Sequence, residues 1–282
     1  MSILTLNILF RQKYRHSRCS GQVGRNKKMI NLDDAFAVMD DKVIASLDLS
    51  MFSETDLLNI LLQRSEILGD LPRPGKIIRA WSNGNEGPIR DTIAQMGETI
   101  ARRTAAFIYC EFLALKPTLE ELKPTRIADI GCGYAFFDLF AAQYFDCDIT
   151  LIDIETNDHR HFGYEKEGAA YTNLSQATSL LVKNGIARSR VTAINPQKSD
   201  INAIEKVDLA VSFVSCGYHY PANTYAEFFR DGVKENGSLI LDLRRRTAKG
   251  QSRELETYGE LTFLTEAAAG SAHRMLVRKS AT

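Results

Sequence analysis

From Pro124 onward, short apolar runs alternate with longer segments in which apolar residues recur every three or four positions. The short runs predict strands, and the longer segments predict helices. The predicted strands are 126–130, 148–153, 190–194, 207–213, 238–243, 261–265 and 273–279, and the predicted helices are 136–144, 168–184, 223–233 and 247–256. Because the helices lie between successive strands, we expect a mostly parallel sheet that is covered on both faces.

The connection between the last two predicted strands is short. Only seven residues, from Glu266 to Ala272, join them, whereas a parallel crossover needs about a dozen or more. The final strand must therefore enter antiparallel to its neighbour. We expect an α/β protein with a seven-stranded, mostly parallel sheet whose last strand is antiparallel.

The segment 31–124 has a helical pattern. Ser53, followed by Glu54 and Asp56, predicts an N-cap with acids in the first turn, and leucines then recur at helical spacing up to Leu68. This segment therefore predicts an amphipathic helix near the start of the ordered chain.

The stretch 69–88 is rich in Gly and Pro and predicts a loop that holds the only tryptophan, Trp81. Its last residue is a proline, placed to begin a long helix over about 88–115. We expect residues 29–124 to form an N-terminal helical cap on a second domain, residues 125–282.

Charge is distributed unevenly along the chain. Residues 1–32 hold seven Lys or Arg and no acid, whereas residues 33–282 hold 28 basic and 35 acidic side chains. A mildly acidic body lacks the phosphate-neutralising surface that general nucleic-acid binding needs, so no nucleic-acid partner is expected. The sequence of residues 1–28 is typical of a basic disordered arm, or of a translated leader upstream of a start at Met29. A transit peptide is the alternative.

The five cysteines include no C-x-x-C pair, so neither a disulfide framework nor a zinc cluster is predicted. No apolar run approaches about 18 residues, and no membrane partner is expected. Cysteine usage of this kind favours a reducing compartment, and we expect a cytoplasmic protein.

A glycine-rich turn follows the first predicted strand, in the order Asp129-Ile-Gly131-Cys132-Gly133-Tyr-Ala. An open parallel sheet binds nucleotide-like ligands at such a turn. Gly131 can turn sharply, and Gly133 lets a ligand approach the backbone. A dinucleotide fingerprint needs a glycine where this chain has the bulky Phe136, so NAD is disfavoured, and no Gly-Lys-Ser/Thr follows to make a phosphate-binding P-loop.

The pattern acid-x-Gly-x-Gly-x-Ala resembles the first motif of the class I S-adenosylmethionine-dependent methyltransferases. The resemblance covers residues 125–279 and includes seven strands with an antiparallel last one. It implies a Rossmann-like fold, S-adenosylmethionine as the cofactor, and cofactor contacts from Asp129, Gly131, Cys132 and Gly133.

The same resemblance implies further cofactor contacts at the ends of the next strands. In the family an acid at the end of the second strand holds the ribose hydroxyls, and Asp153 stands there with Glu155 as a second candidate. A carboxylate accepts two hydroxyl donors well, although a single acid at this place also suits a helix cap. The family also often has an acid or amide near the adenine, just after the third strand. Asn195 matches that residue by position, and Asp200 matches it by residue type. Phe213, at the end of the fourth strand, is expected to lie beside the sulfonium of S-adenosylmethionine.

The chemistry is expected in the segment 212–221 after the fourth strand. His219 is the candidate general base, because an imidazole with an ordinary pKa of about 6.5 suits proton removal at neutral pH. The alternative is a loop histidine bonded to the backbone. Tyr218 and Tyr220 are predicted to line the acceptor site, and Trp81 of the cap is predicted to face it.

Family signatures narrow the acceptor. Amino-group methylators commonly carry Asp/Asn/Ser-Pro-Pro-aromatic at this place, and residues 215–218 keep only the ends of that signature. The segment 212–220 has no carboxylate for a magnesium site, and His159 and His161 lack a third ligand, so no metal is expected. Together with the sequence of 162–174, the segment resembles bacterial class I enzymes described as sugar O-methyltransferases.

We therefore expect an S-adenosylmethionine-dependent methyltransferase that acts on a hydroxyl of a saccharide or other small molecule. An N-methyltransferase and a catalytically silent cofactor-binding or scaffold protein are the alternatives. The run Arg244–Arg246 after the fifth strand either meets an acidic group of the acceptor or stands in solvent. Cys216 is expected to be a small buried thiol.

Overall fold

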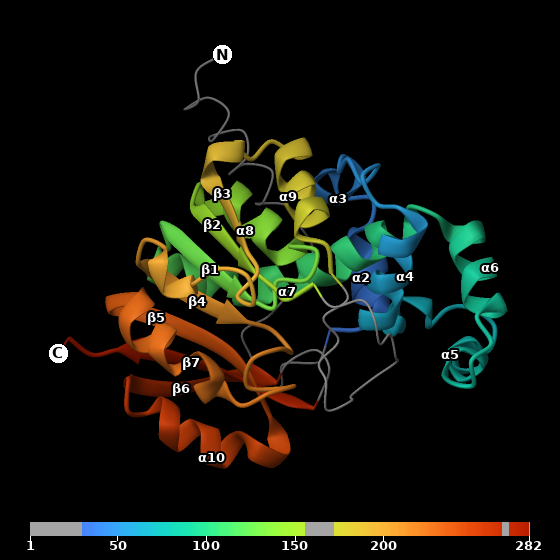
Figure 1. Cartoon of the computed structure of the whole chain (residues 1–282). Coiled ribbons are helices and arrows are strands. Elements are labelled where there is room, and N and C mark those ends of the chain that lie inside the picture. The colour runs from blue at the N-terminus through green and yellow to red at the C-terminus, as the bar shows by residue number, and fades with distance from the viewer. Residues whose placement is uncertain (1–29, 156–171, 267–270, 282) are drawn as a thin grey trace.

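The computed structural model describes residues 30–155, 172–266 and 271–281. At its centre is one sheet in the order β3-β2-β1-β4-β5-β7-β6 (Figure 1). Its strands are β1 (Arg126–Ile130), β2 (Asp148–Ile152), β3 (Val191–Ile194), β4 (Val207–Ser212), β5 (Val233–Arg244), β6 (Gly259–Glu266) and β7 (Ala272–Lys279). The strands β1 to β5 pair in parallel, and β7 runs antiparallel to both β5 and β6. The predicted seven-stranded α/β sheet with an antiparallel last strand is confirmed.

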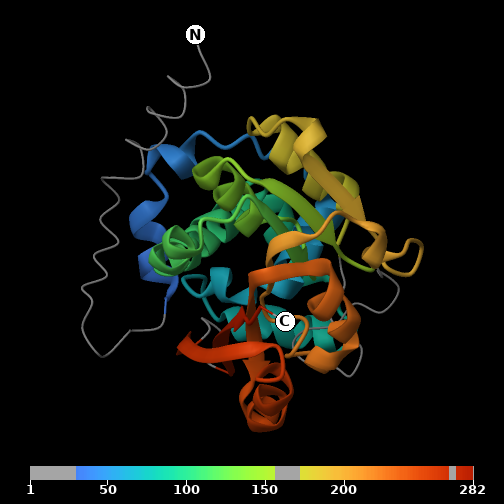
Figure 2. The same cartoon turned by 90° about the vertical axis from the view of Figure 1, so that its left-hand side faces the viewer.

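Successive residues of the central strands point to opposite faces of the sheet, and both faces are buried. In β1, Ile127 joins one apolar cluster, whereas Ala128 and Ile130 join the other. This alternation follows from the period of two along a strand. The helices α7, α8 and α9 cover the first face, and α10 with the short turns η4 and η5 covers the second (Figures 1 and 2).

The other regular elements of the described residues are helices. The α-helices are α2 (Leu32–Val38), α3 (Lys42–Ala45), α4 (Glu54–Gln63), α5 (Pro74–Ser82), α6 (Gly87–Met96), α7 (Thr99–Leu122), α8 (Phe136–Phe145), α9 (Leu174–Lys183) and α10 (Arg245–Leu255). The shorter helices are η1 (Ser65–Leu68), η2 (Arg188–Arg190), η3 (Ile201–Ala203), η4 (Ala222–Tyr225) and η5 (Phe228–Gly232). As predicted, Ser53 caps α4, and it does so in a reciprocal pair of hydrogen bonds with Asp56.

Two predictions for the N-terminal helices were wrong. The predicted loop 69–88 contains the helix α5, because Pro74 stands in its first turn and fixes a helical φ there. The predicted single helix from residue 88 is split into α6 and α7 at Gly97, whose φ of +51° and ψ of −130° suit glycine. The helices therefore turn back on themselves before α7 reaches the sheet.

Three boundaries in the second half also differ from the prediction. Residues 223–233 form the 3₁₀ turn η4 and the π-helical turn η5 in place of one α-helix, and β5 already begins at Val233. The helix α9 begins at Leu174, with Asn173 as its N-cap, and not at residue 168.

The predicted arm 1–28 lies outside the described residues, as does part of the connection between β6 and β7.

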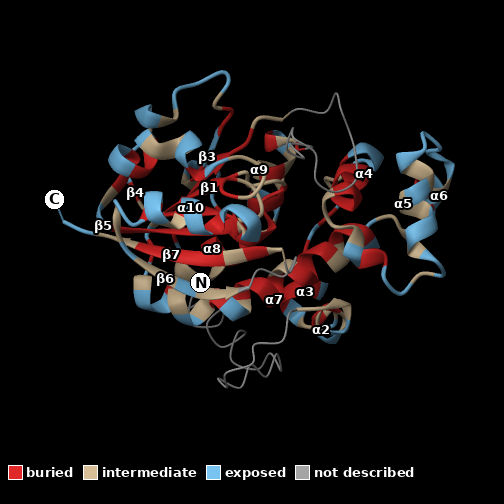
Figure 3. Ribbon diagram, turned by 90° about the horizontal axis from the view of Figure 1, so that it is seen from below, coloured by how far each residue is buried: buried red, intermediate tan, exposed pale blue. Residues whose placement is uncertain are grey.

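The N-terminal helices and the sheet share one buried core. One apolar cluster joins Leu61 of α4, Phe112 of α7, Phe140 of α8 and Ile149 of β2. Figure 3 shows the buried residues running without a break from the central strands into α7. The division into domains at residue 124 stays a prediction.

A buried ion pair joins β5 to the antiparallel strand β7. Asp242 is fully buried and Arg274 is 4% exposed, and two hydrogen bonds of 2.7 and 2.8 Å make the pair bidentate. The Arg274 guanidinium also lies 4.4 Å from the ring centre of Phe213, just beyond β4. This pair therefore connects the outer strands to the end of β4.

Replacing Arg274 by Met should lower the free energy of unfolding by about 3–5 kcal/mol, because it leaves the Asp242 carboxylate buried without its partner. Chemical denaturation measures the change. The double variant Asp242→Leu with Arg274→Met should recover most of the loss. As a control, Arg278→Met removes an exposed ion pair with Glu121 and should cost at most about 1 kcal/mol.

Candidate cofactor and active site

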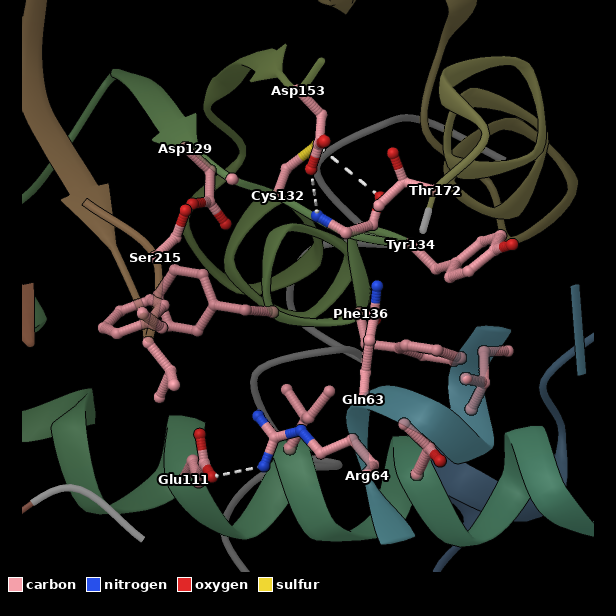
Figure 4. A pocket seen from close by; sticks show the side chains of 18 of the residues that line it. Gln63, Arg64, Glu111, Asp129, Cys132, Tyr134, Phe136, Asp153, Thr172 and Ser215 are labelled. Atoms are coloured by element: carbon pink, nitrogen blue, oxygen red, sulfur yellow. Dashed lines mark hydrogen bonds and ion pairs between the residues drawn. The ribbon is translucent and has the colours of Figure 1, made fainter. Parts of the chain in front are cut away.

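A cavity of about 850 Å³ opens at the carboxyl ends of β1, β2 and β4. The glycine loop after β1, Asp153 after β2 and the segment 213–220 after β4 line its sheet side, and residues of α4 and α7 line the opposite side (Figure 4). Open α/β sheets bind their ligands at this edge, so the cavity is the candidate site.

The glycine loop requires its first two glycines. Gly131 has a φ of +77°, and a Cβ atom there would lie 2.0 Å from Ser215 Oγ, so only glycine fits. Gly133 also has a left-handed φ, of +56°, and its backbone N–H donates to Asp153 Oδ2 at 3.1 Å. The backbone of the loop is thus held between the ends of β2 and β4.

Asp153 is 7% exposed and lies directly after β2, where the sequence predicts the residue that holds the ribose. Burial raises the pKa of its carboxyl, and hydrogen bonds from Gly133 and Thr172 oppose that shift. Figure 4 shows the Asp153 carboxylate close to Thr172, at the border of the cavity. The side chain is therefore oriented in advance, and its oxygens can accept hydroxyl donors.

A pair of buried carboxyls lies beneath the glycine loop. Asp129 is 3% exposed, and its Oδ1 has no hydrogen-bond partner among the described residues. Burial and the neighbouring charge of Asp138 raise the Asp129 pKa well above its ordinary value, and burial raises the Asp138 pKa to about 7. Because two adjacent buried carboxyls do not both ionise readily, the pair holds a proton near neutral pH.

The segment after β4 carries hydroxyl and imidazole groups into the cavity. Val214 has a φ of +52°, which is costly for a β-branched residue and turns the chain sharply. The hydroxyls of Ser215 and Tyr220 are 3.0 Å apart, and burial raises the pKa of Tyr220. His219 also lines the cavity, and its backbone N–H donates to the Ser215 carbonyl at 2.8 Å.

An ion pair lies on the opposite wall of the cavity. Arg64, at the end of α4, is 2.9 Å from the carboxylate of Glu111 on α7. Burial favours the neutral form of Glu111, but the charges of Arg64 and Arg274 hold its pKa below the ordinary value. This wall therefore contains charged groups at a site otherwise rich in apolar side chains.

Tyr134 of the glycine loop fixes the cap helix α4 over the cavity. Its hydroxyl donates to Asp56 Oδ1 at 2.9 Å and accepts from Asn59 Nδ2 at 3.0 Å, and its ring packs edge-on against Phe52. These buried contacts set the distance between the two walls.

The structure brings together eight of the site residues predicted from the sequence. The residues that line the cavity are Asp129, Gly131, Cys132, Gly133, Asp153, Phe213, His219 and Tyr220. Three others do not line it: Asn195, Tyr218 and Trp81.

The three residues outside the cavity have other contacts. The Asn195 amide donates to the Ile154 carbonyl at 2.9 Å and braces the turn after β2. The Tyr218 hydroxyl lies 2.5 Å from Ser271 Oγ, at the start of β7. Trp81 is half-buried on α5, the helix that the sequence pattern presented as a loop.

Several residues that line the cavity were not singled out by sequence reasoning. Arg64 and Glu111 are 47 positions apart, so no local spacing signals their contact. Thr172 was predicted within the helix 168–184 and given no role in the site, and Ser215 was considered only as part of a signature. The run Arg244–Arg246, at the end of β5 and the start of α10, does not line the cavity.

Within the described ranges, no group of three or more His, Cys, Asp or Glu side chains is arranged to hold a metal ion. His159 and His161 lie outside those ranges. None of the helices described here combines the length and the apolar character that crossing a membrane requires.

Comparison with protein-family models and with curated proteins finds no match. Among solved structures, the methyltransferase SibL, described as S-adenosylmethionine-dependent, is similar at 12% identity over 80% of this chain and 74% of its own, with a TM-score of 0.46. A geranyl diphosphate methyltransferase is similar at 14% identity over 65% and 82%, with a TM-score of 0.43. A ribosomal protein L11 methylase from Lactobacillus delbrueckii is similar at 16% identity over 63% and 80%, with a TM-score of 0.41.

These similarities concern the fold alone. The sheet of this chain independently has the seven strands and the single reversed strand that the glycine-loop resemblance implied. The chain therefore has the Rossmann-like α/β fold that the resemblance implied.

Proposed function

We propose that this protein transfers a methyl group from S-adenosylmethionine to a hydroxyl of a small molecule or saccharide. The observation that carries the proposal is the hydrogen bond between Gly133 and Asp153 at the border of a cavity that continues to His219. It joins a glycine backbone to the Asp153 carboxylate, which would accept ribose hydroxyls, in the cavity that His219 also lines.

The residues of the sheet side fit the methyl donor. The Asp153 carboxylate would accept the two ribose hydroxyls, and the absence of a Cβ on Gly133 lets a ligand lie against the backbone. Asp129 has a buried oxygen without a partner in the described part of the chain, which suits a polar group of the ligand. When bound, the donor supplies an electrophilic methyl group on a positively charged sulfur.

The segment after β4 would serve the acceptor. His219 is placed to take the proton of an acceptor hydroxyl, and Ser215 and Tyr220 offer hydroxyls that can orient that group. The phenol of Tyr220 stays protonated because burial raises its pKa. The apolar side chains of the cavity limit water, and positioning of the two reactants supplies much of the acceleration.

S-Adenosylhomocysteine should raise the melting temperature of the protein, whereas NAD should not, because the buried Phe136 stands where the dinucleotide motif needs glycine. Asp153→Ala should weaken S-adenosylhomocysteine binding by roughly tenfold or more, since it removes a charged hydrogen-bond acceptor. Differential scanning calorimetry measures the melting temperature, and isothermal titration calorimetry measures the affinity. Asp91→Ala, at an exposed acid of α6 that does not line the cavity, is the matched control and should bind like the wild type. A preference for NAD would overturn the proposal.

His219→Ala should lower turnover by roughly 10² to 10⁴, the usual range for a general base, while the affinity for S-adenosylhomocysteine stays close to that of the wild type. Turnover is read as formation of S-adenosylhomocysteine with an acceptor found by screening. His273→Gln, on the antiparallel strand β7 and outside the cavity lining, is the control and should keep full turnover. Unchanged turnover in His219→Ala would make His219 a structural loop residue.

A further inference from the structure

Arg64 is the only Arg or Lys among the described residues that line the cavity. It stands at the end of α4, across the cavity from the glycine loop (Figure 4). The proposed methyl transfer does not use it, so its place in the wall calls for a separate explanation.

Only one nitrogen of the Arg64 guanidinium takes part in its ion pairs. Both of its ion pairs, with Glu111 at 2.9 Å and with Glu66 at 3.3 Å, use Nη1. Neither Nε nor Nη2 has a hydrogen-bond partner in the described part of the chain, and the side chain is 21% exposed. These two nitrogens form the planar edge that binds a carboxylate or phosphate through two hydrogen bonds.

The surroundings hold this edge in place before any ligand binds. Glu111 is 6% exposed on α7, and the guanidinium carbon of Arg64 lies 5.6 Å from the ring centre of Phe107. Glu111 also faces Arg274, so its charge is shared between two arginines. Glu66 is 43% exposed, and solvent weakens its pairing with Arg64. An anion at the free edge therefore meets a cation that is only partly neutralised.

The ion pair lies near the end of β4, where the acceptor is expected. Arg274, which faces Glu111, lies over the ring of Phe213. The ribose acceptor Asp153 belongs instead to the loop after β2. This placement favours the methyl-accepting substrate, and not the ribose of the methyl donor, as the ligand near Arg64.

The lining around Arg64 has a large apolar part beside polar side chains such as Gln63 and Thr104. The apolar side chains of the cavity include Ile60, Phe107, Ile108, Phe136, Phe137 and Phe213. A saccharide would leave several hydroxyls without partners against such a surface, and each unpaired polar group costs free energy. An apolar ring or chain fills the same space without that cost.

We propose that the acceptor is a largely apolar hydroxyl compound bearing a carboxylate or phosphate, and that Arg64 binds this anionic group through Nε and Nη2. The inference rests on the proposed methyltransferase function and narrows its substrate class. It selects an acidic small molecule over a neutral saccharide.

Binding to the protein loaded with S-adenosylhomocysteine tests the proposal by calorimetry. The probes are matched pairs, 4-hydroxybenzoate with 4-hydroxybenzamide and 4-hydroxyphenylacetate with 4-hydroxyphenylacetamide, together with hydroxyalkyl phosphates and free saccharides. At least one anionic probe should bind, and at least tenfold more tightly than its neutral partner or any saccharide. Arg64→Gln should weaken that binding by roughly tenfold to a hundredfold.

Because Arg64→Gln strands the buried Glu111, the double variant Arg64→Gln with Glu111→Gln repeats the test without an unpaired charge. Glu111→Gln alone keeps the cation and should retain binding of the anionic probe. Arg90→Gln removes an exposed arginine of α6 and is the matched control.

Three results would overturn the proposal. They are a neutral probe or saccharide that binds as tightly as any anionic one, no binding of any anionic probe, and unchanged anion binding in the double variant. A fourth would reassign Arg64 to the donor: the double variant loses affinity for S-adenosylhomocysteine but not for 5′-methylthioadenosine, which lacks the carboxylate. Failure of the methyltransferase proposal itself appears separately, as absence of S-adenosylhomocysteine binding to the wild type.

Discussion

The hydrogen bond from the Gly133 backbone to the Asp153 carboxylate connects the two loops on which the site depends. It can form because β1 and β2 are parallel neighbours in register, with Ile130 opposite Ile152. Their following residues therefore leave the sheet at the same edge. Since β4 flanks β1 on its other side, Ser215 meets Gly131 at a distance that excludes a side chain there. The pairing of β1 with β2 and β4 thus determines where the loops of the site lie relative to one another.

The same edge holds backbone conformations that L-amino acids rarely adopt. Ala135, Glu155 and Val214 all have a positive φ, one in the turn after each of β1, β2 and β4. Such residues cost about 1–3 kcal/mol each and persist only where the surrounding structure determines them. Here the buried core beneath the turns and the contact of Tyr134 with α4 supply that support. The strain is concentrated where the backbone must turn around a ligand.

The sheet could be predicted from the sequence because its signals are local. Apolar runs mark each strand, and seven residues before β7 exclude a crossover helix. The glycine loop, Asp153 and His219 could be singled out for the same reason, since each lies at the end of a predicted strand or in the loop that follows it. Arg64 and Glu111 could not be found this way, because folding alone brings α4 and α7 together. Trp81 was predicted in a loop, because the Gly and Pro residues around it are typical of loops, whereas it lies on the helix α5.

The central claim is that the loops after β1, β2 and β4 surround one molecule of the methyl donor. A crystal structure with S-adenosylhomocysteine bound tests this claim most directly. The account predicts both ribose hydroxyls within about 3.2 Å of the Asp153 carboxylate and the sulfur in the space between the glycine loop and His219. A ligand bound elsewhere, or bound at this edge without contact to Asp153, would contradict it.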